Sequence, residues 1–140
     1  MKKEIINPET GDWADHEVAY AEGVAVRMAG AKRVFISGIV AEGETIEAQT
    51  RNVLEYIDGL LADHGGGMRD VVRVRVYISR PHMDDEALET VHDVRNEFFV
   101  QDHLPASTLV EVEDLVNEDY MIEIDADAII PDGEWDVELV

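Results

Sequence analysis

Five histidines, three serines and a run of alternating acids are the groups with which this chain could do chemistry. The histidines stand at positions 16, 64, 82, 92 and 103, and no two have the i, i+4 spacing with which a helix holds a metal ion. None of the serines at 37, 79 and 107 lies in a Gly-x-Ser-x-Gly turn. Cysteine is absent, which excludes disulfides, thiolate ligands and a cysteine nucleophile. The sequence therefore gives little support for a metal site or a Ser-His-Asp triad.

Three weaker signals leave alternatives open. Ser37-Gly38 ends a predicted strand, where a glycine permits close approach of a ligand or simply eases the exit of the chain. The acids Glu123, Asp125 and Asp127 alternate along another strand, so they either bring carboxylates together or form a solvated face. His92 is either a polar site residue or a hydrogen-bonded histidine at the end of the core.

The charge balance narrows the choice of partners. Eleven basic residues against 32 acidic ones give a net charge of −21. Nucleic acid is a poor partner for such a chain, because phosphate binding needs clustered Lys and Arg. Lysine is nearly absent, and about 1 M salt shortens the Debye length to roughly 3 Å and screens the repulsion. We interpret the acidity as adaptation to concentrated salt.

The length of 140 residues predicts a single domain, spanning residues 1–130 and followed by an acidic tail at 131–140 with no role in the fold. The apolar runs are far shorter than the roughly 18–20 residues that span a bilayer, and no apolar segment follows the N-terminal lysines. We therefore expect no membrane partner and a cytoplasmic location.

Hydrophobic periodicity predicts the elements that must position these groups. Residues 7–19 are expected to form a loop or edge, and the helices are expected at 45–64, capped by Thr45, and at 84–99. The strands are expected at 24–28, 34–37, 70–79, 108–112 and 120–130.

The strand at 70–79 shows the expected two-layer arrangement most directly. Val72, Val74, Val76 and Ile78 alternate with Arg73, Arg75 and Tyr77. The inner face of the second helix is predicted to carry Leu88, Val91, His92, Arg95 and Phe98. Two helices on one face of a mixed sheet give an α+β two-layer sandwich, and the other face is expected to associate with further chains.

Several segments, in this order and spacing, resemble the Rid family (reactive intermediate deaminases, YjgF-like or L-PSP). They are Glu47 to Leu54, Asp70 to Arg73, Tyr77-Ile78, Thr90-Val91-His92, Phe98-Phe99, Leu104-Pro105-Ala106, Val110-Glu111-Val112 and Ile122-Glu123-Ile124. The resemblance implies a chorismate-mutase-like fold, a homotrimer and small-molecule clefts between subunits. It also implies hydrolysis of 2-imino acids to 2-oxo acids and ammonia with neither metal nor cofactor.

The resemblance also assigns site residues. The cleft tyrosine of the family falls on Tyr20, although Val18-Ala19 stand where a Gly-Pro pair is usual. The strand-end pair falls on Ser37 and Gly38, and the acid that helps to hold the attacking water falls on Glu123. His92 replaces a helix asparagine and keeps a hydrogen-bonding group.

One departure bears on activity. Deaminating members read Pro-Ala-Arg-Ser, with the arginine clamping the substrate carboxylate, whereas this chain reads Pro105-Ala106-Ser107-Thr108. A hydroxyl offers the carboxylate one neutral donor, whereas a guanidinium offers a planar pair of charged donors. A charged hydrogen bond is stronger than a neutral one by about 1–2 kcal/mol, so the loss should slow turnover of an anionic imino acid by at least roughly tenfold. Either Arg75 or Arg95 could restore the positive charge, the other possibility being that each pairs with an acid.

The sequence thus predicts a cleft for a small organic ligand, with Glu123 and Ser107 as the catalytic residues and Tyr20, Ser37, Gly38, His92, Pro105 and Ala106 binding the substrate. In this hypothesis the cleft hydrolyses imines or enamines, and turnover of 2-imino acids is impaired by the loss of the arginine. The alternative is a metabolite-binding or regulatory trimer without catalysis. Cleavage of RNA is disfavoured by the acidic composition.

Overall fold

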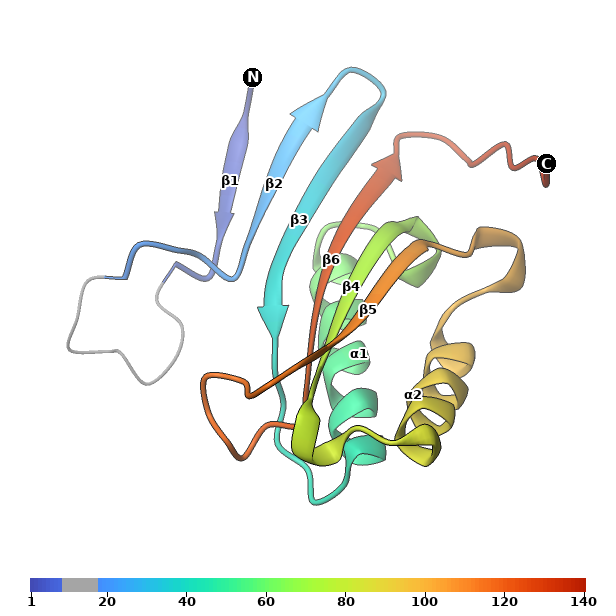
Figure 1. Ribbon diagram of the computed structural model, residues 1–140. Helices are drawn as coiled ribbons and strands as arrows, with labels where there is room; N and C mark the ends of the chain where they lie inside the picture. Colours follow the sequence, from blue (N-terminus) through green and yellow to red (C-terminus); the bar gives the residue numbers. More distant parts are fainter. Residues whose placement is uncertain (9–17) are drawn as a thin grey trace.

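A computed structural model describes residues 1–8 and 18–140 as a six-stranded sheet covered on one face by two helices (Figure 1). The predicted α+β two-layer sandwich is confirmed. Most of the expected loop at 7–19, including His16, lies outside the described residues. The elements are β1 (Lys3–Ile6), β2 (Gly23–Met28), β3 (Ala31–Ile39), α1 (Ile46–Asp63), β4 (Val71–Ser79), α2 (Asp85–Phe98), β5 (Ala106–Val112) and β6 (Ile122–Pro131).

The strands lie in the order β1-β2-β3-β6-β4-β5. β5 is parallel to β4 because α2 crosses back between them, and all the other neighbouring strands are antiparallel. β6 lies between β3 and β4, and its alternate residues from Ile122 to Ile130 are buried beneath the helices. The outward-facing residues of this central strand therefore lie in the middle of the open face.

Helix α1 begins as the sequence predicts. The side chain of Thr45 accepts a hydrogen bond from the backbone N–H of Ala48 at 3.1 Å. Gly65 follows the helix with φ +83°, a left-handed conformation that glycine adopts without strain. The buried face of α1 also includes Gln49, which the hydrophobic pattern does not predict.

Helix α2 is rotated relative to the prediction. Its fully buried positions are Ala87, Val91 and Val94, spaced four and three residues apart. His92, predicted on the inner face, is exposed because it lies about 100° around the helix from Val91. Arg95 lies at the margin of the buried face and is partly buried.

In strand β4 the structure also differs from the prediction of which residues face the core. The pairing of β4 with β6 shifts between Val71 and Arg73, an irregularity that places an extra residue in β4. Val71 is therefore buried and Val72, predicted inside, is exposed. From Val74 to Ile78 the predicted alternation is confirmed.

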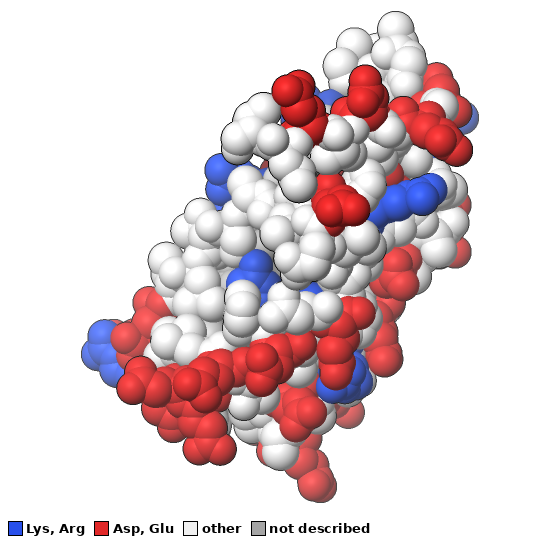
Figure 2. All heavy atoms as spheres, turned by 90° about the vertical axis from the view of Figure 1, so that its right-hand side faces the viewer, with Lys and Arg blue, Asp and Glu red and all other residues white. Residues whose placement is uncertain are grey.

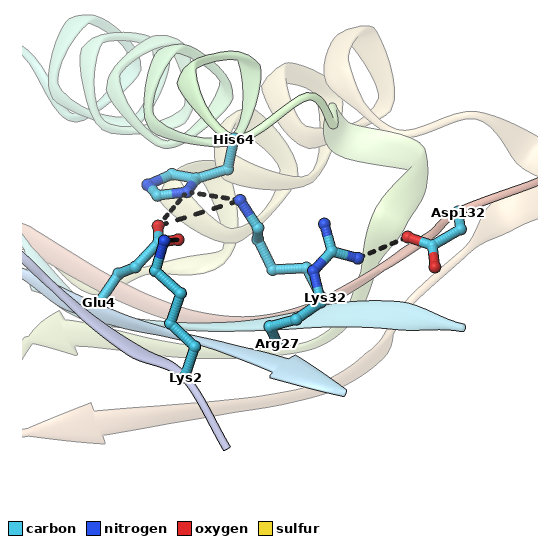
Figure 3. Close-up of polar contacts among 6 residues, drawn as sticks. All are labelled: Lys2, Glu4, Arg27, Lys32, His64 and Asp132. Atoms are coloured by element: carbon cyan, nitrogen blue, oxygen red, sulfur yellow. Dashed lines mark hydrogen bonds and ion pairs between the residues drawn. The ribbon is translucent and has the colours of Figure 1, made fainter. Parts of the chain in front are cut away.

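The short strand β1, which the sequence does not predict, is attached to the sheet and to the end of α1 by polar side-chain contacts of Glu4 (Figure 3). Glu4 lies 3.6 Å from Nδ1 of His64 and 3.9 Å from Nζ of Lys32. Lys2 approaches the same carboxylate at 3.6 Å. In the same view Arg27 of β2 pairs with Asp132 at 2.5 Å, which ties the end of β6 to the hairpin.

The segment at 131–140, for which the sequence predicts no role in the fold, contacts the body of the protein. The indole N–H of Trp135 donates to Oδ1 of Asp70 at 2.7 Å, and the backbone N–H of Gly67 donates to Oδ2 at 2.9 Å. Asp70 is buried, so each donor offsets part of the cost of removing a carboxylate from water. The first half of the tail is therefore part of the folded structure.

We expect Trp135→Phe to lower the free energy of unfolding by about 1–3 kcal/mol, because a buried carboxylate oxygen then loses its donor. Urea unfolding followed by circular dichroism measures the change. Leu139→Ala, at an exposed position of the same tail, is the control and should leave the midpoint unchanged. Equal midpoints for wild type and Trp135→Phe would show that the tail does not stabilise the fold.

Within the described ranges, neither helix combines the length and apolar character needed to cross a membrane.

Candidate functional site

The residues predicted for the site separate into two groups within one chain. Tyr20, Ser37, Gly38 and Glu123 lie around the end of β3, whereas His92, Pro105, Ala106 and Ser107 lie on α2 and at the start of β5. The strand order places β6 and β4 between β3 and β5.

The first group borders a pocket of 520 Å³ at the end of β3. Tyr20, Ser37 and Gly38 line it, together with residues 39–41 and with three polar residues that the sequence does not indicate: Glu22, Asn52 and Tyr56. The Ser37 hydroxyl donates to the backbone carbonyl of Ala21 at 2.7 Å, so its proton is already engaged. A pocket of this size accommodates a small organic molecule.

Glu123 lies directly against Gly38. A Cβ atom built on Gly38 would stand 2.8 Å from Cδ and 2.9 Å from Oε2 of Glu123, closer than real Cβ contacts allow. The glycine is therefore needed so that the carboxylate can approach the strand end. Because Gly38 lines the pocket and also contacts Glu123, the Glu123 carboxylate lies beside the pocket.

The environment of Glu123 weakens its acidity. Burial raises the pKa of the Glu123 carboxyl above its ordinary value, and repulsion from Asp125 raises that pKa further. A carboxylate with a raised pKa is a stronger proton acceptor once it has ionised. Glu123 is therefore suited to hold a water molecule and accept a proton from it.

Pairing across the sheet shows that Glu123 and Ser107 point to opposite faces. Ser107 pairs with Val74, which is buried beneath the helices, whereas Glu123 pairs with the outward-facing Tyr77. Residues directly paired on neighbouring strands share a face, and successive residues alternate. Ser107 therefore lies on the helix side and Glu123 on the open side, so one chain cannot direct both at the same small molecule.

The second group contains Arg95, one of the two arginines that the sequence analysis considers as a source of positive charge near Ser107. Arg95 of α2 reaches β5, and its Nη2 donates to the Ser107 hydroxyl at 2.7 Å. Burial lowers the pKa of the Arg95 guanidinium, but arginine remains protonated in proteins. Within residues 1–8 and 18–140, Arg95 forms no salt bridge, although 32 of the 140 residues of the chain are acidic.

This arrangement changes the prediction for Ser107. A guanidinium lies beside Ser107 although residue 107 is not itself an arginine, because Arg95 reaches it from the neighbouring helix. Ser107 and Ala106 are exposed and Pro105 is partly buried, so this corner of the molecule is accessible. The exposed His92 lies on the same helix as Arg95.

Arg75, the other candidate for the missing charge, is paired with acids on the open face. It lies 2.8 Å from Asp125 and 3.7 Å from Asp127, and the Tyr77 hydroxyl donates to Asp125 at 3.0 Å. The hydrogen bond from Arg75 to Asp125 raises the pKa of Arg75, and burial raises the pKa of Tyr77. Arg75 is thus part of an ion-pair network, and Asp125 and Asp127 are paired rather than simply solvated.

Gln49 is a positioning residue that the sequence analysis misses. Its side-chain amide donates to the carbonyls of Gly43 and Asp119, each at 3.0 Å, and its Oε1 accepts from the backbone N–H of Met121 at 2.8 Å. The buried side chain thereby holds the start of β6, two residues before Glu123. Its place three residues after Ile46, on the apolar row of α1, is the signal that could have identified it.

The surface charge follows the composition. Figure 2 shows acidic side chains gathered along the lower part of the side that carries α2 and the C-terminal segment, with few basic ones. Among the residues that the structure describes, no three His, Asp or Glu side chains are grouped so as to hold a metal ion.

Comparison with known proteins links this geometry to a family. A family model described as Endoribonuclease L-PSP matches residues 14–130. A RutC family protein from Pyrococcus abyssi is 34% identical over 90 residues, which cover 64% of this chain and 65% of the relative. A RutC family protein from Synechocystis is 32% identical over 93 residues, covering 66% and 67%. The matched segment is thus just under two thirds of the length of the Pyrococcus protein.

Solved structures show the same fold. A member of the YjgF/YER057c/UK114 family from Mycobacterium tuberculosis superposes with a TM-score of 0.75 and 29% identity, covering 92% of this chain and 100% of that one. A protein described as a putative endoribonuclease from Thermotoga maritima gives a TM-score of 0.69 and 27% identity, covering 95% and 100%.

Proposed function

Because this chain belongs to the L-PSP endoribonuclease family, also called the Rid or YjgF-like family, we propose that it hydrolyses imines in a cleft formed between two copies of the chain. The observation that carries the proposal is that Glu123 and Ser107 point to opposite faces of the sheet. Glu123 and the pocket at the end of β3 form one half, and Arg95 with Ser107 forms the other. Two chains of a closed ring can bring the first half of one copy against the second half of the next.

In this cleft Glu123 acts on water. The Glu123 carboxylate accepts a proton as the water oxygen attacks the imine carbon, and the C=N π electrons move to nitrogen, which is also protonated. The resulting carbinolamine loses ammonia when its C–N bond breaks and the C=O bond forms. One water and one imine thus give one carbonyl compound and one ammonia, with no change of oxidation state.

Arg95 and Ser107 act on the substrate. A charged guanidinium, partly removed from water and without an acidic partner in the described residues, is suited to receive a carboxylate. The Ser107 hydroxyl accepts from Arg95 and holds its side chain toward β5. We therefore propose that the substrates are imines that carry a carboxylate.

The test is the release of ammonia from freshly generated 2-iminopropanoate, compared with propan-2-imine, which has a methyl group in place of the carboxylate. The proposal predicts clear acceleration over spontaneous hydrolysis for the first compound and little for the second. Acceleration of neither would remove the proposed activity. Saturable binding of 2-oxo acids without any turnover would instead favour the metabolite-binding alternative.

Cleavage of RNA has less support. The net charge of −21 and the acidic surface in Figure 2 repel a phosphate backbone. Salt-sensitive RNA binding by the purified protein would contradict this part of the proposal.

The proposed setting is a homotrimer in a salt-rich cytoplasm. The outward-facing Phe35 and Val110 are both exposed on the open sheet face, as expected for a surface that meets other chains. In about 1 M salt the repulsion among many acids is largely screened, so association should be favoured there.

The activity should depend on pH through Glu123. Only the ionised carboxylate accepts a proton, so kcat/KM should fall as the pH is lowered through the pKa of Glu123, which burial and Asp125 raise. Asp125→Asn removes the repulsion but not the burial, so it should move the acid limb to lower pH. Asp127→Asn, two residues along the same strand, is the control and should leave the limb in place. An acid limb that is identical in all three proteins would show that it does not report Glu123.

A further inference from the structure

Glu22 is a charged group of the 520 Å³ pocket that the proposed chemistry does not use. The residue is partly buried, and its backbone is fixed on both sides. Its N–H donates to the carbonyl of Ile6 at 3.0 Å, and its carbonyl accepts from the N–H of Ser37 at 2.8 Å. The carboxylate therefore projects from a backbone tied to both β1 and β3.

Neutral donors hold the Glu22 carboxylate in place. The Tyr56 hydroxyl donates to Oε1, and the Asn7 side-chain amide donates to Oε2 at 2.5 Å. The hydrogen bond to Glu22 raises the pKa of Tyr56 to about 12, so the phenol keeps its proton and remains a donor. No Lys, Arg or His in the described part of the chain forms a salt bridge with Glu22, so within that part its negative charge has no cationic partner.

Two further polar side chains of the pocket lining already donate to backbone carbonyls. The Ser37 hydroxyl donates to the carbonyl of Ala21, and the Asn52 amide donates to the carbonyl of Glu42 at 2.9 Å. Toward the pocket the Glu22 carboxylate, the Asn52 carbonyl oxygen and the Tyr56 oxygen offer acceptor capacity, and the Tyr20 hydroxyl can donate or accept. Such a lining repels an anion and favours a cation that donates several hydrogen bonds.

We infer that Glu22 selects substrates whose far end carries a cationic hydrogen-bond donor, such as a guanidinium or an ammonium group. This inference rests on the proposed function, because it assigns the substrate class of the same cleft. Arg95 receives the carboxylate beside the reacting imine, whereas Glu22 receives the end of the side chain. The preferred substrates are therefore imino acids with basic side chains.

Three imino acids, generated in place by an amino-acid oxidase, test this selection. Those from arginine, citrulline and norleucine carry, respectively, a charged donor, a neutral donor of the same shape and no donor. We expect kcat/KM to be about tenfold or more higher for the arginine compound than for the norleucine compound, with citrulline between them. Glu22→Gln should reduce the arginine preference to about that of citrulline.

The control variants separate charge recognition from a structural role. Glu55→Gln removes the same charge from an exposed position of α1, beside Tyr56, and should leave the preference intact. Tyr56→Phe removes a donor but keeps the Glu22 charge, so the arginine preference should persist. Equal kcat/KM for all three substrates in the wild type, or loss of the preference in Glu55→Gln, would overturn the inference.

Calorimetry distinguishes failure of this inference from failure of the proposed function. The probes are 5-guanidinopentanoate and hexanoate, stable compounds that need no turnover. Binding of the first that is tighter by about tenfold and lost in Glu22→Gln would support the inference even if no imine is hydrolysed. Equal binding of the two probes would overturn it even in an active enzyme.

Discussion

Replacing Arg95 by alanine is expected to lower kcat/KM for 2-iminopropanoate by roughly tenfold to a hundredfold, because a charge-assisted hydrogen bond to the carboxylate contributes about 1.5–3 kcal/mol. Hydrolysis of propan-2-imine, which has no carboxylate, should change little. Steady-state assays of ammonia release on the two compounds measure the difference. The effect should be confined to the anionic substrate because Arg95 contacts Ser107 and not Glu123.

Two further variants make this prediction specific. Arg95→Lys keeps the charge but not the planar fork, so it should retain only part of the activity. Arg95→Ala combined with Ser107→Arg moves the guanidinium from α2 to β5 and should recover most of the loss. If Arg95→Ala turns over both compounds as wild type does, the anion-binding role of Arg95 is wrong.

Replacing Glu123 by glutamine should have a larger effect, a decrease in kcat of roughly 10²–10⁴, since general-base catalysis typically contributes that much. Glutamine is close in shape, so it should still fit against Gly38 while losing the ability to accept a proton. The loss should extend to every imine that the protein hydrolyses, with or without a carboxylate. Single-turnover assays separate this loss of chemistry from a loss of binding.

The control for this variant is Asp125→Asn, which also removes a carboxylate from the open face of β6. It should retain substantial activity because Asp125 pairs with Arg75 and Tyr77 rather than contacting Gly38. Full activity of Glu123→Gln would show that another group handles the proton.

The architecture was predictable because periodicity decides it. The apolar rows of both helices and the alternation of β6 indicate one buried face for each element, and the N-cap of α1 is at Thr45 as expected. The errors occur where periodicity does not determine facing. An irregularity in β4 exposes Val72, and a small rotation of α2 exposes His92.

The candidate site was less predictable, since it depends on contacts between elements that are distant in sequence. The sequence pattern could indicate both Arg95 and Arg75 as sources of the positive charge missing at position 107. Only the packing of α2 against β5 places Arg95 at Ser107. The pairing of Arg75 with Asp125 depends likewise on the neighbouring strands β4 and β6. Glu22 and Tyr56, which lie far apart in the sequence, meet only in the folded chain.

The division of the cleft between two chains is the central claim, and complementation between inactive variants tests it most directly. Coexpressed Arg95→Ala and Glu123→Gln chains should form mixed oligomers. In some of their clefts, Glu123 of the first variant would face Arg95 of the second. At equal mixing about one quarter of the clefts would be intact, so activity on 2-iminopropanoate should rise well above the sum of the two variants alone. Mixed oligomers, verified by mass, that remain no more active than that sum would contradict the account.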